Sequence, residues 1–87
     1  MASYKLRIKR SAQKEIRRLP SQIRKAVVAR IGRLIKDPRP NGVEKLREFE
    51  SVYRVRVGKY RIVYGIDDRV VTITVIKVGH RKDVYRR

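Results

Sequence analysis

The chain has 87 residues, so we expect one domain, residues 1–87, with a modest core and little room for a deep small-molecule pocket. Lysines and arginines number 25 against 8 aspartates and glutamates, and a net charge of +17 favours a polyanionic partner, most commonly nucleic acid, although an acidic protein is also compatible. The lack of cysteine excludes disulfides and thiolate zinc sites and fits a reducing cytoplasm, and we expect neither a signal peptide nor a membrane span.

The first element is predicted to be a strand followed by a short helix. Apolar and basic residues alternate over residues 4–9, which is typical of a strand with one solvated face. Ser11 is a candidate N-cap for the helix, and Pro20 ends it. The apolar stripe of this helix consists of Ala12, Ile16 and Leu19.

A second, longer helix is predicted to follow. Ser21 is its candidate N-cap, and prolines with Asn-Gly in residues 37–42 prevent it from continuing. Gly32 lies inside the helical pattern and weakens it slightly. The apolar side of the helix consists of Ile23, Val27, Ile31, Leu34 and Ile35.

The second half of the chain predicts three antiparallel strands, at residues 53–57, 60–66 and 70–78. Asp67-Asp68-Arg69 forms the turn between the last two. Apolar residues fall on both faces of the third strand, which indicates a position inside the sheet. The fold class is therefore α+β: a strand, two helices and three strands, with one sheet that carries the helix pair on one face.

The first two of these strands are predicted to form a tight hairpin. Gly58-Lys59 is a two-residue loop with glycine first, which suits a type II′ turn. Residues directly opposite each other share a face of the sheet, so the register decides which side chains gather. The expected pairs are Val57 with Tyr60, Arg56 with Arg61, and Val55 with Ile62. The valines, Tyr60 and Ile62 then face the helices.

Three arginines, Arg54, Arg56 and Arg61, fall on the opposite face of this hairpin. Like charges directly opposite each other destabilise a hairpin, and a phosphate between two guanidinium groups removes that repulsion. We therefore predict that these arginines grip a nucleic-acid backbone. The alternative is that they are ordinary solvated charges, paired with Glu48 or Glu50.

The segment after the last strand supplies further polar candidates: His80, Arg81, Lys82 and Tyr85. Histidine is a common general acid or base, so His80 is a candidate for that role, although a lone histidine is more often a surface residue. Tyr85 is a candidate for stacking on a base, for donating a proton, or for covering the core. One histidine, no cysteine and scattered carboxylates predict no metal site; Asp67-Asp68 is read as a turn rather than a magnesium pair.

From Tyr4 to Tyr85 the chain resembles the RelE family of toxins, within the wider RelE/ParE superfamily. The residues that carry the resemblance are Lys45-Leu-Arg47, Tyr53-Arg-Val-Arg56, Tyr60-Arg-Ile-Val-Tyr64, Val78-Gly-His-Arg81 and Val84-Tyr85. The resemblance implies a cytoplasmic, cofactor-free endoribonuclease that enters the ribosomal A site and cleaves the bound mRNA. It also implies two helices packed on a small sheet, and an antitoxin that covers the basic face.

The resemblance further assigns roles to single residues. Arg54 and Arg56 contact the phosphate, and Arg61 and Arg81 stabilise the transition state of an attack by the RNA 2′-hydroxyl. Tyr85 matches a tyrosine near the family's C-terminus, and His80 a position that is basic in relatives. The residues expected to extend the RNA-binding surface are Lys45, Arg47, Lys59 and Lys82.

One departure from the family pattern changes the assignment of the general base. Some relatives carry lysines where this chain has Arg54 and Arg56. Because arginine does not give up its proton readily, we expect His80 or Tyr85 to move the proton instead.

Two other functions stay open, a ParE-like toxin that inhibits gyrase and a non-catalytic protein that binds the ribosome or RNA. A DNA-binding regulator is disfavoured, since no helix-turn-helix is evident.

Overall fold

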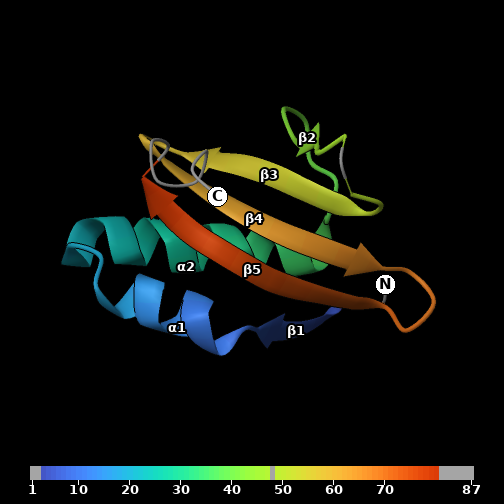
Figure 1. Ribbon diagram of the computed structural model, residues 1–87, viewed down its shortest axis with the longest axis horizontal. Coiled ribbons are helices and arrows are strands. Elements are labelled where there is room, and N and C mark those ends of the chain that lie inside the picture. Colours follow the sequence, from blue (N-terminus) through green and yellow to red (C-terminus); the bar gives the residue numbers. More distant parts are fainter. Residues whose placement is uncertain (1–2, 48, 81–87) are drawn as a thin grey trace.

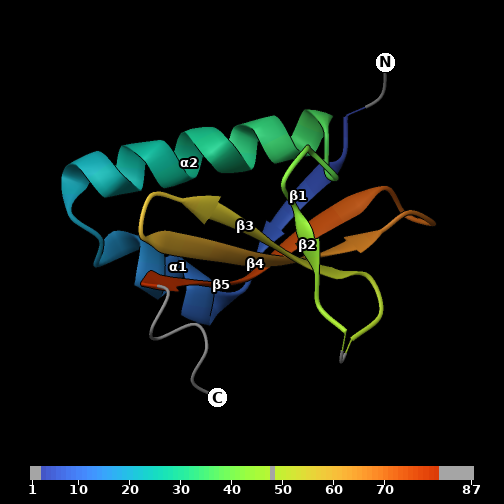
Figure 2. The ribbon, with the colours of Figure 1, turned by 90° about the horizontal axis from the view of Figure 1, so that it is seen from above.

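A computed structural model describes residues 3–47 and 49–80 and confirms the predicted α+β architecture. The five strands form one sheet in the order β1-β5-β4-β3-β2, and both helices lie on one of its faces (Figures 1 and 2). The elements are β1 (Lys5–Ile8), α1 (Arg10–Arg17), α2 (Ser21–Lys36), β2 (Glu44–Lys45), β3 (Val52–Val57), β4 (Tyr60–Asp67) and β5 (Thr72–His80).

The sheet differs from the prediction by one additional strand and by both bounds of the last strand, which ends at His80 rather than Val78. The short strand β2, which pairs antiparallel with β3, was not predicted, because two residues show no hydrophobic periodicity. The last strand begins at Thr72 rather than Val70, since Val70 and Val71 belong to the preceding turn and Val71 has a φ of +50°. Its position inside the sheet is confirmed, because β5 pairs parallel with β1 and antiparallel with β4.

The predicted serine caps are wrong for both helices. The helix α1 begins at Arg10 with Lys9 in the N-cap position, and α2 begins at Ser21 with Pro20 in that position. Neither cap residue makes a side-chain capping hydrogen bond. The fixed φ of proline already supplies the extended backbone that an N-cap needs, and the Pro20 carbonyl accepts the Arg24 N–H at 2.8 Å.

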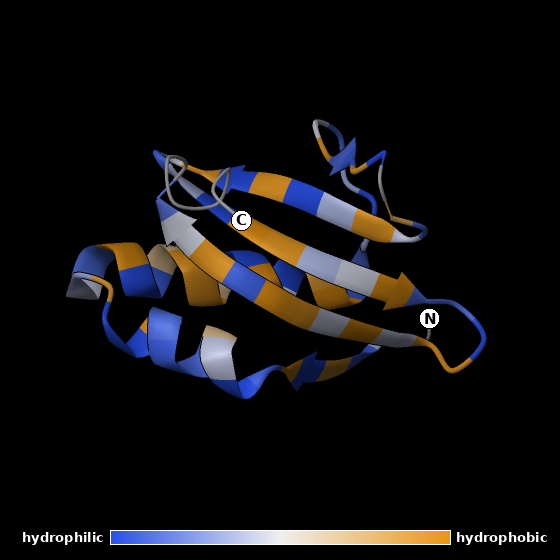
Figure 3. Cartoon of the chain, in the orientation of Figure 1, coloured by the Kyte–Doolittle hydropathy of each residue, from blue (hydrophilic) through white to orange (hydrophobic). Residues whose placement is uncertain are grey.

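The core lies between the helix pair and the sheet, as the apolar stripes predicted (Figure 3). Each of its fully buried aliphatic side chains contributes roughly 1.5–3 kcal/mol by leaving water. Leu6 is an exception on the predicted apolar face of β1, because 38% of it remains exposed at the sheet edge. The core residues include Ala12, Ile16 and Leu19, then Val27, Ile31 and Leu34, and finally Val55, Ile62, Ile73, Val75 and Val78.

A polar network fixes the loop after α2 to the sheet. The hydroxyl of the buried Tyr64 donates to the Pro38 carbonyl at 2.6 Å, and its ring stacks on Tyr53 with centroids 6.0 Å apart. Burial raises the pKa of Tyr64 to about 12, so its hydroxyl keeps the proton that this bond needs. The loop therefore starts from a rigid point on the core.

Arg39 extends this network to the turn between β4 and β5. Its guanidinium donates to the Tyr53 hydroxyl at 3.1 Å and forms an ion pair with Asp68 at 2.9 Å. The Tyr4 hydroxyl donates to the same carboxylate at 2.7 Å. The hydrogen bond from Arg39, followed by that from Tyr4, lowers the pKa of Asp68. We call Tyr4, Arg39, Tyr53, Tyr64 and Asp68 the Arg39 network.

Candidate functional site

The hairpin of β3 and β4 has the register that its turn predicted. Val57 pairs with Tyr60, Arg56 with Arg61, and Val55 with Ile62. Gly58 has a φ of +59°, while Lys59 does not have a positive φ, which matches a type II′ turn. Val55 and Ile62 are buried under the helices, so the arginines lie on the other face.

We call the face away from the helices, with Arg54, Arg56 and Arg61, the arginine face. These side chains differ in exposure: Arg56 is exposed, whereas Arg61 is only 4% exposed. At Arg61 the sheet continues on both sides, with Arg56 of β3 and Gly79 of β5, whereas β2 pairs with β3 only at Tyr53 and Arg54 and does not extend to Arg56. A guanidinium that is screened from water attracts an anion more strongly than an exposed one.

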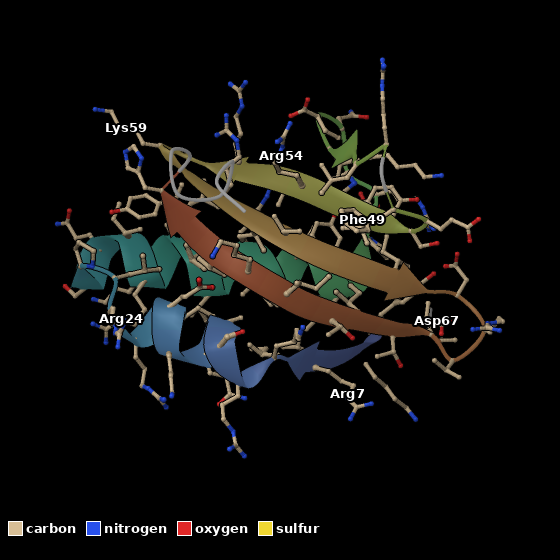
Figure 4. The ribbon with its side chains drawn as sticks, in the orientation of Figure 1. Arg7, Arg24, Phe49, Arg54, Lys59 and Asp67 are labelled. Carbon is tan, nitrogen blue, oxygen red and sulfur yellow. The ribbon has the colours of Figure 1, made fainter. Side chains whose placement is uncertain are left out.

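Arg54 has a carboxylate partner, but not one that the sequence suggested. Its guanidinium forms a 3.1 Å ion pair with Glu44 of β2, which lies directly opposite it in the sheet, rather than with Glu50. Glu48 lies outside the described residues. The sequence did not predict this partner, because nothing in the two residues of β2 indicated a strand. Figure 4 shows Arg54 on β3, the strand that neighbours β2.

Arg56 is in a different situation. Among the residues that the structure describes, no carboxylate lies within ion-pair distance of it. Its directly opposite neighbour is another arginine, Arg61. The charge repulsion predicted from the sequence is therefore built into the register of this hairpin.

His80 does not join the arginines. It ends β5 and pairs with Tyr60, and the two rings meet edge to face with centroids 5.5 Å apart. Tyr60 lies on the helix-covered face with Val57, so the sheet separates His80 from the arginine face. Arg61 instead pairs with Gly79.

The remaining predicted residues lie around this centre or outside the described part of the chain. Lys59 is exposed at the hairpin turn (Figure 4). Lys45 and Arg47 are also exposed and line a shallow hollow of about 430 Å³ beside Phe49, next to β2. Arg81, Lys82 and Tyr85 lie outside the described residues.

Over residues 3–47 and 49–80, no group of three or more histidines, cysteines, aspartates and glutamates is placed to hold a metal ion. In the same ranges, no helix is both long and apolar enough to cross a membrane.

The sequence is similar to toxins of known families. It matches, over residues 6–85, the family model of the ParE toxin of type II toxin-antitoxin system, parDE. It is 36% identical to toxin RelG of Mycobacterium tuberculosis over 85 residues, which cover 97% of this chain and 98% of that protein. It is 32% identical to the mRNA interferase toxin RelE of Escherichia coli over 82 residues, which cover 92% and 85%.

Solved structures agree with these sequence matches. The isolated E. coli RelE toxin superimposes with a TM-score of 0.81 at 28% identity, and the match covers 97% of this chain and 98% of that one. The toxin-antitoxin complex RelBE2 of M. tuberculosis gives a TM-score of 0.80 at 33% identity and covers 92% of this chain and all of that one.

Proposed function

The chain belongs to the RelE family of toxins of type II toxin–antitoxin systems, and we propose on that premise that it is a ribosome-dependent endoribonuclease. One observation carries the proposal: Arg56 and Arg61 lie directly opposite each other on the face away from the helices. Two guanidinium groups on one face can bind a phosphate together through paired N–H donors, and the phosphodiester of RNA is an anion of suitable shape. The E. coli relative is named an mRNA interferase, which makes mRNA the substrate we propose.

The proposed reaction is a transesterification within the mRNA chain. The 2′-oxygen attacks the adjacent phosphorus, the bond from phosphorus to the 5′-oxygen breaks, and a 2′,3′-cyclic phosphate and a 5′-hydroxyl result. Arg61, with Arg81, stabilises the charge of the pentacovalent phosphorane, and Arg54 and Arg56 hold the backbone in place. A chain with one histidine and no cysteine suits a reaction that uses no metal or cofactor.

Two protons move in this reaction, one from the 2′-hydroxyl and one to the departing 5′-oxygen. Arginine is a poor proton acceptor, so Arg54 and Arg56 serve as electrostatic groups. His80 and Tyr85 are the sequence candidates for this transfer. The position of His80 beside Tyr60, on the helix-covered face, weighs in favour of Tyr85.

We also propose that a cognate antitoxin binds this protein in the cytoplasm and blocks the arginine face. Structures similar to this chain include toxin–antitoxin complexes from M. tuberculosis and E. coli. The strongly basic surface suits a partner with acidic segments, since opposite charges speed encounter and select the partner. The same surface would meet mRNA in the ribosomal A site, so antitoxin and RNA would compete for it.

A second candidate function is inhibition of DNA gyrase. It is favoured by one observation, the match of residues 6–85 to the ParE toxin model. Against it we set the arginine face, because two opposed arginines, Arg56 and Arg61, suit the binding of a phosphodiester.

Primer extension on an mRNA translated with and without the protein tests the proposal. We expect new 5′ ends within codons when ribosomes are present, and none when ribosomes are omitted. A supercoiling assay with purified gyrase runs in parallel. Inhibited gyrase together with intact mRNA would overturn the proposed function in favour of the second candidate. Intact mRNA with active gyrase would leave a protein that only binds RNA or the ribosome.

A further inference from the structure

The pairing of β4 with β5 changes register once, beside the arginine face. Tyr64 pairs with Val75, but the preceding residue Val63 pairs with Lys77, so Ile76 is an extra residue in β5. Such a bulge turns the side chains that follow it to the other face of the sheet. The register after the bulge therefore decides what lies next to Arg61.

The shifted register puts glycine beside Arg61. Gly79 pairs with Arg61, while Val78 pairs with Ile62 and is buried to 1% exposure. Without the extra residue, Val78 would lie opposite Arg61 and Lys77 would lie opposite Ile62 in the core. Because glycine has no side chain, the β5 residue directly opposite Arg61 does not compete with its guanidinium for space on the arginine face.

A carboxylate from α1 holds β5 at this point. The edge of β5 is covered by β1 as far as Val75, whose carbonyl accepts the Lys9 N–H at 3.0 Å. Further along, Glu15 accepts the Val78 N–H through Oε1 at 2.9 Å, and the Lys77 ammonium through Oε2 at 2.9 Å. Glu15 thus takes the place that a backbone carbonyl of a longer β1 would occupy.

We propose that Glu15 is a positioning residue, which fixes the end of β5 so that Gly79 lies beside Arg61. The glutamate side chain is 28% exposed, and hydrogen bonds to a charged acceptor are stronger than those between neutral groups. It lies on α1, on the helix-covered side of the sheet, and acts on RNA only through the strand. The effect on cleavage rests on the proposed function, whereas the effect on the strand does not.

The test compares Glu15→Ala, Glu15→Gln and Gln13→Ala in the full chain. Glutamine keeps an oxygen that can accept the Val78 N–H, so it should rescue what alanine loses. Gln13→Ala is the matched control, because Gln13 also joins α1 to a strand, by donating to the Ile8 carbonyl at 2.9 Å, but does not touch β5. Amide exchange at Val78 and the contact between the Tyr60 and His80 rings are read by NMR. Cleavage is measured as a single-turnover rate on mRNA bound to ribosomes. The affinity of each variant for ribosomes is measured separately.

For Glu15→Ala we expect faster exchange at Val78 and a cleavage rate lower by roughly ten- to a hundredfold, because a small displacement of a positioned group slows the reacting step. The affinity for ribosomes should stay within about twofold, since the exposed basic surface is unchanged. Glu15→Gln and Gln13→Ala should cleave at close to the wild-type rate.

Cleavage by Glu15→Ala at the wild-type rate would overturn the inference. So would an equal loss in Gln13→Ala, or no rescue by Glu15→Gln. If the wild-type protein does not cleave at all, the proposed function fails on its own. The NMR measurements need no ribosome, and unchanged exchange at Val78 in Glu15→Ala would then overturn the inference separately.

Discussion

Arginines at the two ends of the β3–β4 hairpin have opposite surroundings. At the end near Asp68, Arg39 is held by a carboxylate, a hydroxyl and the Tyr53 ring, whose centroid lies 5.2 Å from its guanidinium carbon. At the end near Lys59, Arg56 faces Arg61. Figure 4 labels Lys59 and Asp67 at opposite ends of the molecule.

The difference separates a structural arginine from a binding arginine. The hydrogen bonds that the Arg39 guanidinium donates to Asp68 stabilise the folded chain. An external anion could bind Arg39 only by displacing Asp68. On the arginine face, two like charges lie directly opposite each other, an arrangement that costs stability by itself and that a bound anion would stabilise. Changes at the two ends should therefore separate activity from stability.

The largest expected effect is on cleavage by Arg61→Ala. Loss of a buried donor that stabilises transition-state charge typically costs roughly 10²–10³-fold in rate. The control is Arg39→Ala, which should lose about 1 kcal/mol of unfolding free energy and keep its cleavage rate. Single-turnover cleavage on ribosomes and urea unfolding measure the two quantities. Full activity of Arg61→Ala would remove Arg61 from the mechanism.

Arg56→Thr should change activity and stability in opposite directions. Removing one of two like charges that face each other should raise the free energy of unfolding by about 0.5 kcal/mol. Removing a group that holds the phosphate should slow cleavage roughly tenfold. The same two assays apply, and a loss of both stability and activity would mean that Arg56 supports the fold rather than the ligand.

The hairpin and the helices could be predicted because their signals are local. Gly58-Lys59 sets the turn, and alternation then sets the register, so the arrangement of Arg56 and Arg61 was correct. The bulge at Ile76 carries no comparable local signal. That bulge places His80 on the face of Tyr60, a position that the sequence pattern did not predict.

Partners that are distant in sequence were missed for the same reason. Glu44 meets Arg54 across two strands, and Glu15 meets Val78 from another element. The caps were wrong for a different reason: Ser11 and Ser21 are good capping residues, but Ser11 lies two positions and Ser21 one position after the residue in the N-cap position. Sequence patterns located the surface and its central pair, whereas the groups that position it needed the three-dimensional fold.

A smaller effect is expected on stability at acidic pH, which should depend on the Arg39 network. The hydrogen bond from Arg39 lowers the pKa of Asp68 from its usual value of 3.8. A carboxyl whose pKa is lower in the folded than in the unfolded chain stabilises the fold above its unfolded pKa, and this contribution is lost as the pH falls through the folded pKa. Unfolding free energy should therefore decline below about pH 4, and less steeply in Asp68→Asn. Urea titrations at several pH values measure it, and Arg56→Thr should leave this decline unchanged.

The smallest expected effect is at the ion pair of Arg54 with Glu44. Arg54 is intermediate between Arg39, which the fold holds with several partners, and Arg56, which faces another arginine. Glu44 is 53% exposed, so Glu44→Gln should change the unfolding free energy by at most about 0.5 kcal/mol. Without this carboxylate, one negative group fewer competes with a phosphate for Arg54, and the affinity for a short RNA should rise about twofold, most clearly at low salt. Fluorescence anisotropy over a salt series measures this. A fall in affinity would instead show that Glu44 aims Arg54 at the RNA, which would make this pair a built part of the binding surface.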